Sequence, residues 1–265
     1  PRGQADAVAA QHKPGARQAF DHQFMGETIS ERPFEVLACD PDQVPEARET
    51  SMPIGRHLEG CRLGFDLGAS DRKASAVVDG EAVYTEEVVW SPRDATDPQY
   101  HFDEIMAGLK SAAAHMPRVD AIGGSSAGVI VNNRPMVASL FRGVPKAAFD
   151  AKIKPLFQEI GKAWGVPIEV ANDGDVTALA GAMSLGENSV LGVAMGSSEA
   201  VGYVNAEGNI TGWLNELAFA PIDASPSAPA DEWSGDTGCG VQYLTQQAVF
   251  RLAKKVGIPI DENAQ

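Results

Sequence analysis

Hydrophobic and polar positions follow a regular order from residue 61 onward. Three apolar runs come first, "CRLGFDLG", "KASAVV" and "EAVYTEEVVW", and the Asp79-Gly80 pair between the last two is a strong hairpin signal. The pattern therefore predicts three consecutive strands. Apolar residues at helical spacing then predict a helix over residues 101–115; they are Phe102, Ile105, Met106 and Leu109.

The following segments alternate between strand-like and helical patterns. "VDAIGGSSAGVIV" is strand-like and then glycine-rich, and a helix is expected at about 146–164. "PIEVA" then reads as a short strand, and "NDGDVTALAGAMSLG" as a helix that starts near Asn172 or Asp173. Three strands followed by alternating helices and strands indicate an α/β domain with a mixed sheet.

The second half of the chain repeats the opening pattern. "SVLGVAMGSSEAVGYVNAEGNITG", residues 189–212, reads as strand, small-residue turn, strand, tight turn and strand. This mirrors residues 62–90, and such an internal repeat is a strong architectural signal. It predicts two lobes that meet near residues 184–188, each beginning with a three-stranded antiparallel unit, with two small-residue hairpins on opposite walls of one cleft.

The first 60 residues lack this regularity. They contain six prolines and few periodic apolar positions. A helix-turn-helix domain needs three amphipathic helices in this space, and the pattern shows none. We therefore expect an extended or partly disordered arm, in which "RPFEVLACD", residues 32–40, forms one strand or an edge addition.

Composition and charge narrow the classes of partner. The 265 residues carry a formal net charge of −15, which argues against nucleic acid because phosphate backbones need a basic face. No apolar run approaches the roughly 20 residues that span a bilayer, and no signal peptide is seen, so no membrane partner is expected. The three cysteines, Cys39, Cys61 and Cys239, have no metal-type spacing and read as reduced thiols of a cytoplasmic protein.

Four short segments carry a family resemblance: "DLGASDRK", "VANDGDVTALAGA", "AMGSSEAVGYV" and "GWLNELAF". Over about residues 62–250, their order and spacing resemble the ROK family of sugar kinases and sugar-responsive repressors, within the sugar kinase, Hsp70 and actin superfamily. The resemblance implies an actin-like ATPase fold of duplicated, ribonuclease H-like β-β-β-α-β-α-β-α domains. The expected domains are an irregular arm (1–60), a first lobe (61–186) and a second lobe (187–265).

The first motif has the residue types of a phosphoryl-transfer site. A small-residue turn lets backbone N–H groups approach phosphate oxygens, a nearby cation offsets developing charge, and an acid can hold Mg²⁺ through water. The alternative is a solvated hairpin with an incidental ion pair. The expected assignments are Asp66 for the metal, Gly68, Ala69 and Ser70 for the turn, and Arg72 or Lys73 for the phosphate.

The second motif supplies a candidate base. Phosphoryl transfer to a hydroxyl needs a carboxylate that orients the hydroxyl and accepts its proton late. The residues alone favour a simple helix cap at Asn172 or Asp173, whereas the resemblance implies that Asp173 is the base and Asn172 binds a substrate hydroxyl. Asp175 is expected to complement the helix dipole. The resemblance also assigns Gly128 and Glu216 to the substrate.

The remaining motifs depart from the family. The second phosphate loop reads Gly196, Ser197, Ser198 and lacks two family glycines, and Glu199 places a carboxylate next to it. Phe219 and Val241 stand where the family has a histidine and a glutamate, which predicts a different hydroxyl pattern or a less polar substrate. Only Cys239 remains of the cysteine cluster, and since one thiol cannot build a four-ligand site, no zinc is expected.

Two functional hypotheses follow from the resemblance. The first is an ATP- and Mg²⁺-dependent kinase for a sugar or polyol, and the second is a non-catalytic sugar sensor or structural member of the family. A DNA-binding repressor ranks third, and a homodimer stays open. The family continues beyond "RLAKKVGIPIDENAQ" with further helices and an adenosine-contacting segment, so the second lobe is expected to be incomplete.

Overall fold

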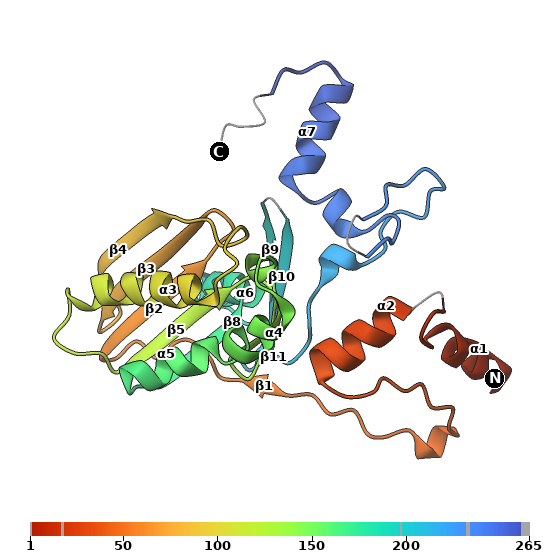
Figure 1. The fold of residues 1–265 in the computed structure, drawn as a ribbon, viewed down its shortest axis with the longest axis horizontal. Coiled ribbons are helices and arrows are strands. Elements are labelled where there is room, and N and C mark those ends of the chain that lie inside the picture. Colours follow the sequence, from red (N-terminus) through yellow and green to blue (C-terminus); the bar gives the residue numbers. More distant parts are fainter. Residues whose placement is uncertain (1, 17–18, 197, 232–233, 261–265) are drawn as a thin grey trace. The chain divides into compact units, whose positions relative to one another are not determined.

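The structure is a computed structural model that describes residues 2–16, 19–196, 198–231 and 234–260. The chain forms two compact units, each with its own sheet (Figure 1). Unit 1 comprises Pro1–Glu49 and Leu58–Ala171, and unit 2 comprises Thr50–His57 and Asn172–Gln265. The five-stranded sheet of unit 1 and the four-stranded sheet of unit 2 each contain one of the two predicted three-stranded antiparallel repeats.

Unit 1 is built on a five-stranded sheet in the order β4-β3-β2-β5-β8. The first three strands form an antiparallel meander, and β5 then pairs parallel with β2. The β3–β4 turn has Asp79 and Gly80 at positive φ (49° and 87°), as the hairpin signal predicted. The strands of this sheet are β2 (Cys61–Leu67), β3 (Asp71–Val78), β4 (Glu81–Val89), β5 (Ala121–Ser126) and β8 (Ile168–Asn172). A separate two-stranded sheet consists of β6 (Val129–Val131) and β7 (Arg134–Val137).

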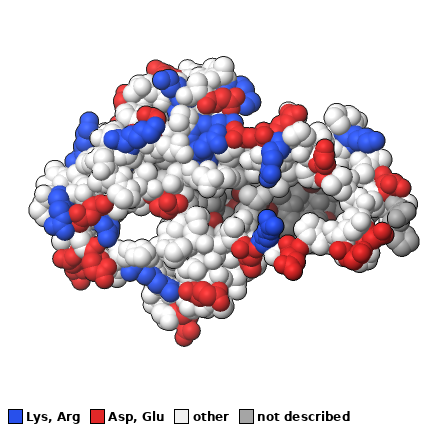
Figure 2. All heavy atoms as spheres, turned by 90° about the horizontal axis from the view of Figure 1, so that it is seen from below, with Lys and Arg blue, Asp and Glu red and all other residues white. Residues whose placement is uncertain are grey.

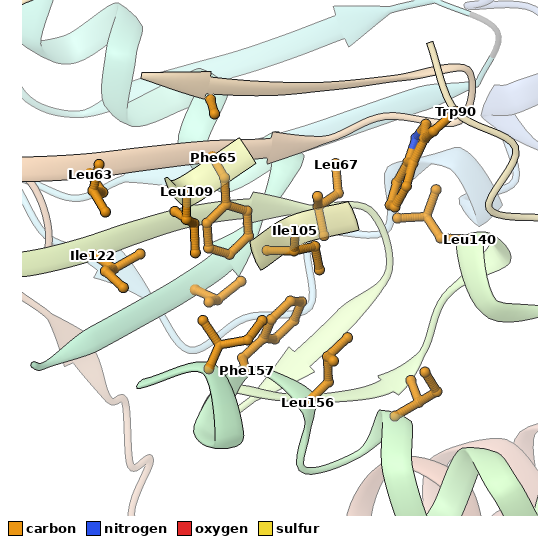
Figure 3. Packing of buried hydrophobic residues seen from close by; sticks show 14 of the residues in the cluster. Leu63, Phe65, Leu67, Trp90, Ile105, Leu109, Ile122, Leu140, Leu156 and Phe157 are labelled. Carbon is orange, nitrogen blue, oxygen red and sulfur yellow. The ribbon is translucent and has the colours of Figure 1, made fainter. Parts of the chain in front are cut away.

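One face of this sheet carries the main apolar core. The side chains of Leu63, Phe65 and Leu67 alternate inward from β2 and meet residues of two helices, including Leu109 and Phe157 (Figure 3). The expected helix at 146–164 is interrupted, since its last part starts after Pro155. The helical segments are α3 (Pro98–Ala113), η3 (Ser139–Phe141), α4 (Lys146–Ala148), η4 (Phe149–Ile153) and α5 (Leu156–Trp164).

The edge strand β8 is covered by a side chain that imitates a backbone partner. Asn133 lies in the β6–β7 turn, where Asn132 and Asn133 have positive φ values of 53° and 58°. Its Oδ1 accepts the N–H of Val170 at 2.6 Å, and its Nδ2 donates to the carbonyl of Ile168 at 3.2 Å. The amide therefore satisfies strand groups that an uncovered edge would expose.

The N-terminal region differs from the expected extended arm, because its first half is helical. It contains α1 (Arg2–Gln11), α2 (Ala19–Asp21), the π-helix η1 (His22–Ser30) and the 3₁₀ turn η2 (Pro41–Gln43). Ile29 of η1 packs against Val129 and Met136 of the β6–β7 hairpin, and Glu31 pairs with Arg134 and Lys154. These tertiary partners are invisible to a local pattern. Residues 32–40 form no strand.

Unit 2 contains an antiparallel sheet in the order β1-β11-β10-β9. The edge addition expected at 32–40 is instead β1, which pairs Ser51 with Thr211 and Met52 with Ile210. The elements are β1 (Ser51–Met52), α6 (Asp173–Leu185), β9 (Val190–Met195), β10 (Glu199–Val204), β11 (Ile210–Thr211), η5 (Leu217–Phe219), η6 (Gly240–Gln242) and α7 (Gln246–Lys255).

Helix α6 packs on β9 and β10 through glycines that allow direct backbone contact. A Cβ at Gly174 would overlap the backbone of Val201, and one at Gly192 would lie 2.5 Å from the Cα of Ala178. This packing groups α6 with the second sheet, and the compact units divide between Ala171 and Asn172. A domain boundary after residue 186 stays a prediction.

Charge on the surface is mixed. On the face in Figure 2, acidic and basic side chains are interspersed, and basic side chains form no continuous area there. Within the part of the chain that the structure describes, no helix combines the length and apolarity that a membrane span requires.

Candidate functional site

The β2–β3 hairpin of unit 1 carries the first set of predicted residues. The N–H of Gly68 donates to the carbonyl of Asp71 at 2.9 Å and closes the turn, so Ala69 and Ser70 lie at its tip. Asp66 and Lys73 are direct cross-strand partners, and their charged atoms lie 3.7 Å apart with both side chains well exposed. The hairpin thus places an acid and a base on one solvent-facing side, beside a small-residue tip.

Lys73 has a second and closer partner that the sequence reasoning missed. Its Nζ donates to Oδ1 of Asp71 at 2.7 Å. This hydrogen bond raises the pKa of Lys73 and lowers that of Asp71. Strand periodicity could have found Asp71, since residues 71 and 73 of one strand share a face.

Arg72 has a different role from the predicted phosphate contact. Its residue is 7% exposed, and its guanidinium donates to Glu86 and Glu104, each at 2.9 Å. It points to the opposite face from Lys73 because successive strand residues alternate. Arg72 therefore stabilises the sheet–helix packing, and Lys73 is the one of the two cations that faces solvent beside the turn.

Trp90 fixes the tip of the hairpin and was also missed. Its indole Nε1 donates to the carbonyl of Gly68 at 2.9 Å, and its main-chain N–H donates to the carbonyl of Ser70 at 3.1 Å. Trp90 itself is buried, with 4% of the residue exposed. No local signal links residue 90 to this turn, because the contact depends on the β3–β4 pairing.

Gly128 of unit 1, predicted to bind substrate, has a clear conformational reason to be glycine. Its φ is +100°, and a Cβ there would overlap the carbonyl of Val137. The residue thus permits a close approach within the β6–β7 region. A contact with substrate stays a prediction.

In unit 2, the N-terminus of α6 separates the roles of Asn172 and Asp173. Asn172 is the N-cap, and its Oδ1 accepts the N–H of Gly174 at 2.8 Å. Asp173 is the first helical residue, and its Oδ1 approaches the same N–H at 3.1 Å. Both side chains therefore accept the same N–H, and the bond to Asn172 is the shorter of the two.

Three carboxyl groups interact at this corner of unit 2. Burial, together with the nearby charges of Asp173 and Asp175, raises the pKa of Glu216 to about 7. Burial also raises the pKa of Asp175 to about 6, although Nδ2 of Asn215 donates to it at 3.0 Å. Asp175 was expected only to complement the dipole, so its partly buried place in this cluster is new. The cluster thus holds two acids, Asp175 and Glu216, whose pKa values are raised toward neutral pH.

The second loop retains two of its predicted residues among those described. The N–H of Gly196 donates to the carbonyl of Ser198, and the carbonyl of Gly196 accepts from Gln246 at the start of α7, both at 2.9 Å. Ser197 lies outside the described residues. Glu199 is 6% exposed and turned into unit 2, where a Cβ at Gly240 would lie 2.6 Å from its Oε2. Burial raises the pKa of this carboxyl, so its predicted repulsion of a phosphate is reduced.

Metal binding finds limited support in the described residues. No cluster of three or more His, Cys, Asp or Glu side chains suited to a metal ion occurs among them. Asp66 is exposed enough to hold Mg²⁺ through water, which remains a prediction. Cys239 is a buried free thiol, and the absence of zinc remains a prediction as well.

The predicted residues thus fall into two sets. Unit 1 brings together Asp66, Lys73 and the hairpin tip, and unit 2 brings together Asn172, Asp173 and Glu216. Asp71, Trp90, Asp175 and Asn215 join these sets through contacts that the structure reveals.

Comparison with known proteins is informative at the level of structure. No protein-family model and no curated protein matches the chain by sequence. Among solved structures, a ROK hexokinase from Thermus thermophilus aligns with a TM-score of 0.57 and 20% identity, over 76% of this chain and 66% of its own. A ROK family transcriptional regulator, a homologue of the E. coli MLC protein, gives a TM-score of 0.61 and 19% identity over 99% of this chain and 62% of its own.

A third solved structure that aligns with this chain is named for two compounds, inorganic polyphosphate and ATP. An inorganic polyphosphate/ATP-glucomannokinase from Arthrobacter aligns with a TM-score of 0.54 and 19% identity, over 77% of this chain and 74% of its own. The chain thus spans less than two thirds of the length of the first two proteins. At these identities the likeness concerns the fold, and it agrees with the resemblance of the four motifs. The chain has the actin-like ATPase fold in the form found in ROK kinases and in a ROK transcriptional regulator.

Proposed function

We propose that this chain is a ROK-type phosphotransferase domain that transfers a phosphoryl group from ATP to a hydroxyl of a sugar or polyol. Asp173 is the general base of this reaction. The observation that carries the proposal is the arrangement at the N-terminus of α6, where Asn172 is the N-cap and the carboxylate of Asp173 lies beside it at the first helical position. A helix N-terminus favours the ionised form of such a carboxylate.

The neighbouring acids suit a substrate rich in hydroxyl groups. With a pKa of about 7, Glu216 carries a proton in a large share of molecules at neutral pH and can donate a hydrogen bond. Asp173 then accepts the proton of the reacting hydroxyl late in transfer, because the transition state of phosphoryl transfer is loose. Asn172 offers its amide to an adjacent hydroxyl.

The hairpin of unit 1 supplies the groups for the nucleotide. Lys73 offers a positive charge, and the tip residues Ala69 and Ser70 offer backbone amides. Asp66 would hold Mg²⁺ through water, and the ion would supply charge neutralisation at the phosphates. The names of two structural neighbours, a hexokinase and an ATP-glucomannokinase, support this class of substrate and donor.

A coupled assay for ADP release with ATP, Mg²⁺ and a panel of hexoses, amino sugars and polyols tests the proposal. We expect transfer to at least one acceptor and a loss of about 10²- to 10⁴-fold in Asp173→Asn. Asp150→Asn is the matched control, because Asp150 is a surface carboxylate paired with lysines in unit 1. Full activity in Asp173→Asn would remove the base assignment.

A specific observation favours a second candidate, a sugar sensor without transfer activity. The regulator aligns over 99% of this chain, whereas the hexokinase aligns over 76%. Moreover, the N–H of Gly196 in the second loop is already bonded within the chain. Calorimetric binding of a sugar, with no ADP release across the same panel, would favour the sensor over the kinase.

A further inference from the structure

Asp175 lies at the point where α6 touches β10 in unit 2. Gly202 of β10 has no side chain, and a Cβ there would overlap the Cα of Asp175. The helix backbone is therefore in direct contact with the strand at this residue. The carboxylate of Asp175 also accepts a hydrogen bond from the backbone N–H of Tyr203, the next residue of β10. Asp175 is thus fixed to the sheet through both its main chain and its side chain.

A second hydrogen bond ties Asp175 to the segment that carries Glu216. Oδ1 of Asp175 accepts from Nδ2 of Asn215 at 3.0 Å. Asn215 has a φ of 51°, in the left-handed region that asparagine tolerates better than most residues. Glu216 follows it directly, as the residue before η5. The side chain of Asp175 therefore holds the backbone bend that precedes Glu216.

Glu216 lies close to the two acids at the start of α6. Burial, together with the charges of Asp173 and Asp175, raises its pKa to about 7. Charges act on a carboxyl group in this way only over short distances, since water and salt screen them within about 10 Å. The bend that Asp175 holds therefore keeps Glu216 in the neighbourhood of Asp173, the proposed base.

We propose that Asp175 is a positioning residue of the substrate site, which holds the Asn215–Glu216 bend on α6 so that Glu216 and Asp173 meet the same substrate. This deepens the proposed function, on which it rests, by a residue that acts only through another. A carboxylate that served only the helix dipole would need no partner beyond its own helix. The two partners of Asp175, Tyr203 and Asn215, both lie outside α6.

The titration of Glu216 tests this position without any need for turnover. Carbon-13 NMR of the side-chain carboxyl would follow Glu216 from about pH 4 to about pH 9 in the wild type, Asp175→Asn and Asp175→Ala. Asparagine keeps an oxygen for the Asn215 amide but removes the charge, so the pKa of Glu216 should fall by at least about 0.5. Alanine also frees the bend, so the pKa should fall further, toward the ordinary value of about 4.3. An unchanged pKa in both variants would overturn the proposal.

Sugar binding separates the anchor from the charge. Calorimetry would use D-glucose, D-mannose and N-acetyl-D-mannosamine. Asp175→Ala should weaken a sugar that binds by about five- to twentyfold, whereas Asp175→Asn should stay within about threefold because it retains the hydrogen bond. Asn215→Gly keeps the positive φ but removes the amide, so it should weaken the sugar as much as Asp175→Ala. Glu187→Gln, at an exposed position just beyond the end of α6, is the matched control and should change nothing.

The double variant with Asp175→Ala and Asn215→Gly completes the test. It should lose no more binding than either single variant, because both changes break the same hydrogen bond. Additive losses, or equal binding in the wild type and Asp175→Ala, would overturn the positioning role and leave phosphoryl transfer intact. No binding of the three sugars to the wild type would overturn it as well, and the ADP assay with its wider panel would then judge transfer separately. Coupled losses of binding without ADP release would support the positioning role and reject the kinase.

Discussion

The adjacent cations Arg72 and Lys73 differ in role because successive residues of a strand point to opposite faces of the sheet. Arg72 faces the helix side, where Gly108 leaves room for it, since a Cβ there would lie 2.7 Å from its Nη1. Lys73 faces solvent with Asp66 and Asp71. The two residues have the same formal charge, yet only the exposed one can meet a ligand.

This difference predicts opposite effects of the same substitution. Arg72→Met removes the partner of Glu86 and Glu104 in a partly buried network and should cost about 2–4 kcal/mol of unfolding free energy. Lys73→Met removes exposed ion pairs and should cost less than about 1 kcal/mol. Urea denaturation of both variants provides the comparison. A larger loss in Lys73→Met would contradict the assignment of the two faces.

The cap at α6 gives a second residue-scale prediction. Asn172→Ala should destabilise unit 2 by about 1 kcal/mol, because it removes the side chain that accepts the Gly174 N–H at 2.8 Å. Asp173→Ala should cost less than about half of that, because Asn172 continues to accept the same N–H. Thermal or urea unfolding of the two variants decides the order, and the reverse order would make Asp173 the true cap.

The acid cluster predicts a pH dependence with a definite sign. Since Glu216 has a pKa of about 7 in the folded protein and about 4.3 when unfolded, the folded state binds more protons between these values. Its contribution to stability therefore declines as the pH rises through this window. Glu216→Gln should be more stable than the wild type by about 1–3 kcal/mol near pH 8, with a difference near zero at about pH 4.5.

The titration of His101 changes stability with pH in the opposite direction to that of Glu216. It is fully buried and burial lowers its pKa, so stability is lost as the pH falls below about 6.5, the unfolded value. The wild type and Glu216→Gln share this term, which cancels when the two are compared at each pH. A stability difference that does not change with pH would show that Glu216 titrates normally.

At this scale, the sequence could predict residues whose role depends on their own segment. Asn172 and Asp173 stand at a recognisable helix start, and Asp66 and Lys73 stand at the ends of paired strands. Trp90 and Asn215 could not be predicted, because their roles depend on partners 22 and 40 residues away in the chain. Arg72 was misassigned because the alternation of β3 was not applied to its two cations.

At the scale of elements, α6 packs closely on its sheet because glycines leave no side chain between the two backbones. Gly174, Gly192 and Gly202 let the helix backbone touch β9 and β10 directly. The helix is otherwise weakly amphipathic, with alanines and Leu179 on its buried side. Its position, and with it the direction of Asp173, therefore depends on backbone contacts that any added methyl group would disturb.

Two glycines of the same helix provide a matched test. Gly174→Ala should destabilise the protein by at least about 2 kcal/mol, because the new Cβ would overlap the Val201 backbone. Gly181→Ala should stabilise it by about 0.4–1 kcal/mol, since its Cβ would meet only Val190 Cγ1 at 3.9 Å. Equal effects in urea denaturation would mean that the close helix–sheet approach is absent.

Elements with a strict period were predictable, and those that need a partner were not. The strands β2, β3, β4, β9 and β10 have two-residue alternation and clear turns, and α3 has a regular apolar stripe. By contrast, η1 buries Ile29 only because the β6–β7 hairpin lies beneath it. The two-residue strands β1 and β11 are too short for any pattern, and their existence depends on pairing.

At the scale of the whole molecule, the two sheets end differently. The outer strand of unit 1, β4, carries Glu81, Glu86 and Glu87, and such charges discourage pairing with another chain. In unit 2 the outer strand of the described sheet is β9, "VLGVAM", which has no charged residue. Its outward side chains Leu191, Val193 and Met195 are 57%, 41% and 64% exposed.

An apolar and uncharged edge strand is a template for further strand pairing. We therefore expect the 265-residue chain to self-associate through β9 as its concentration rises. A register centred on Val193 would place Leu191 opposite Met195 of a second copy, with all these side chains on one face.

Sedimentation velocity over a range of concentrations should show the association, and Val193→Lys should shift it to at least about tenfold higher concentration. Val83→Lys, at a 47% exposed position on the acid-rich strand β4, should leave it unchanged. A chain that stays monomeric throughout, or an equal shift in both variants, would reject β9 as the contact.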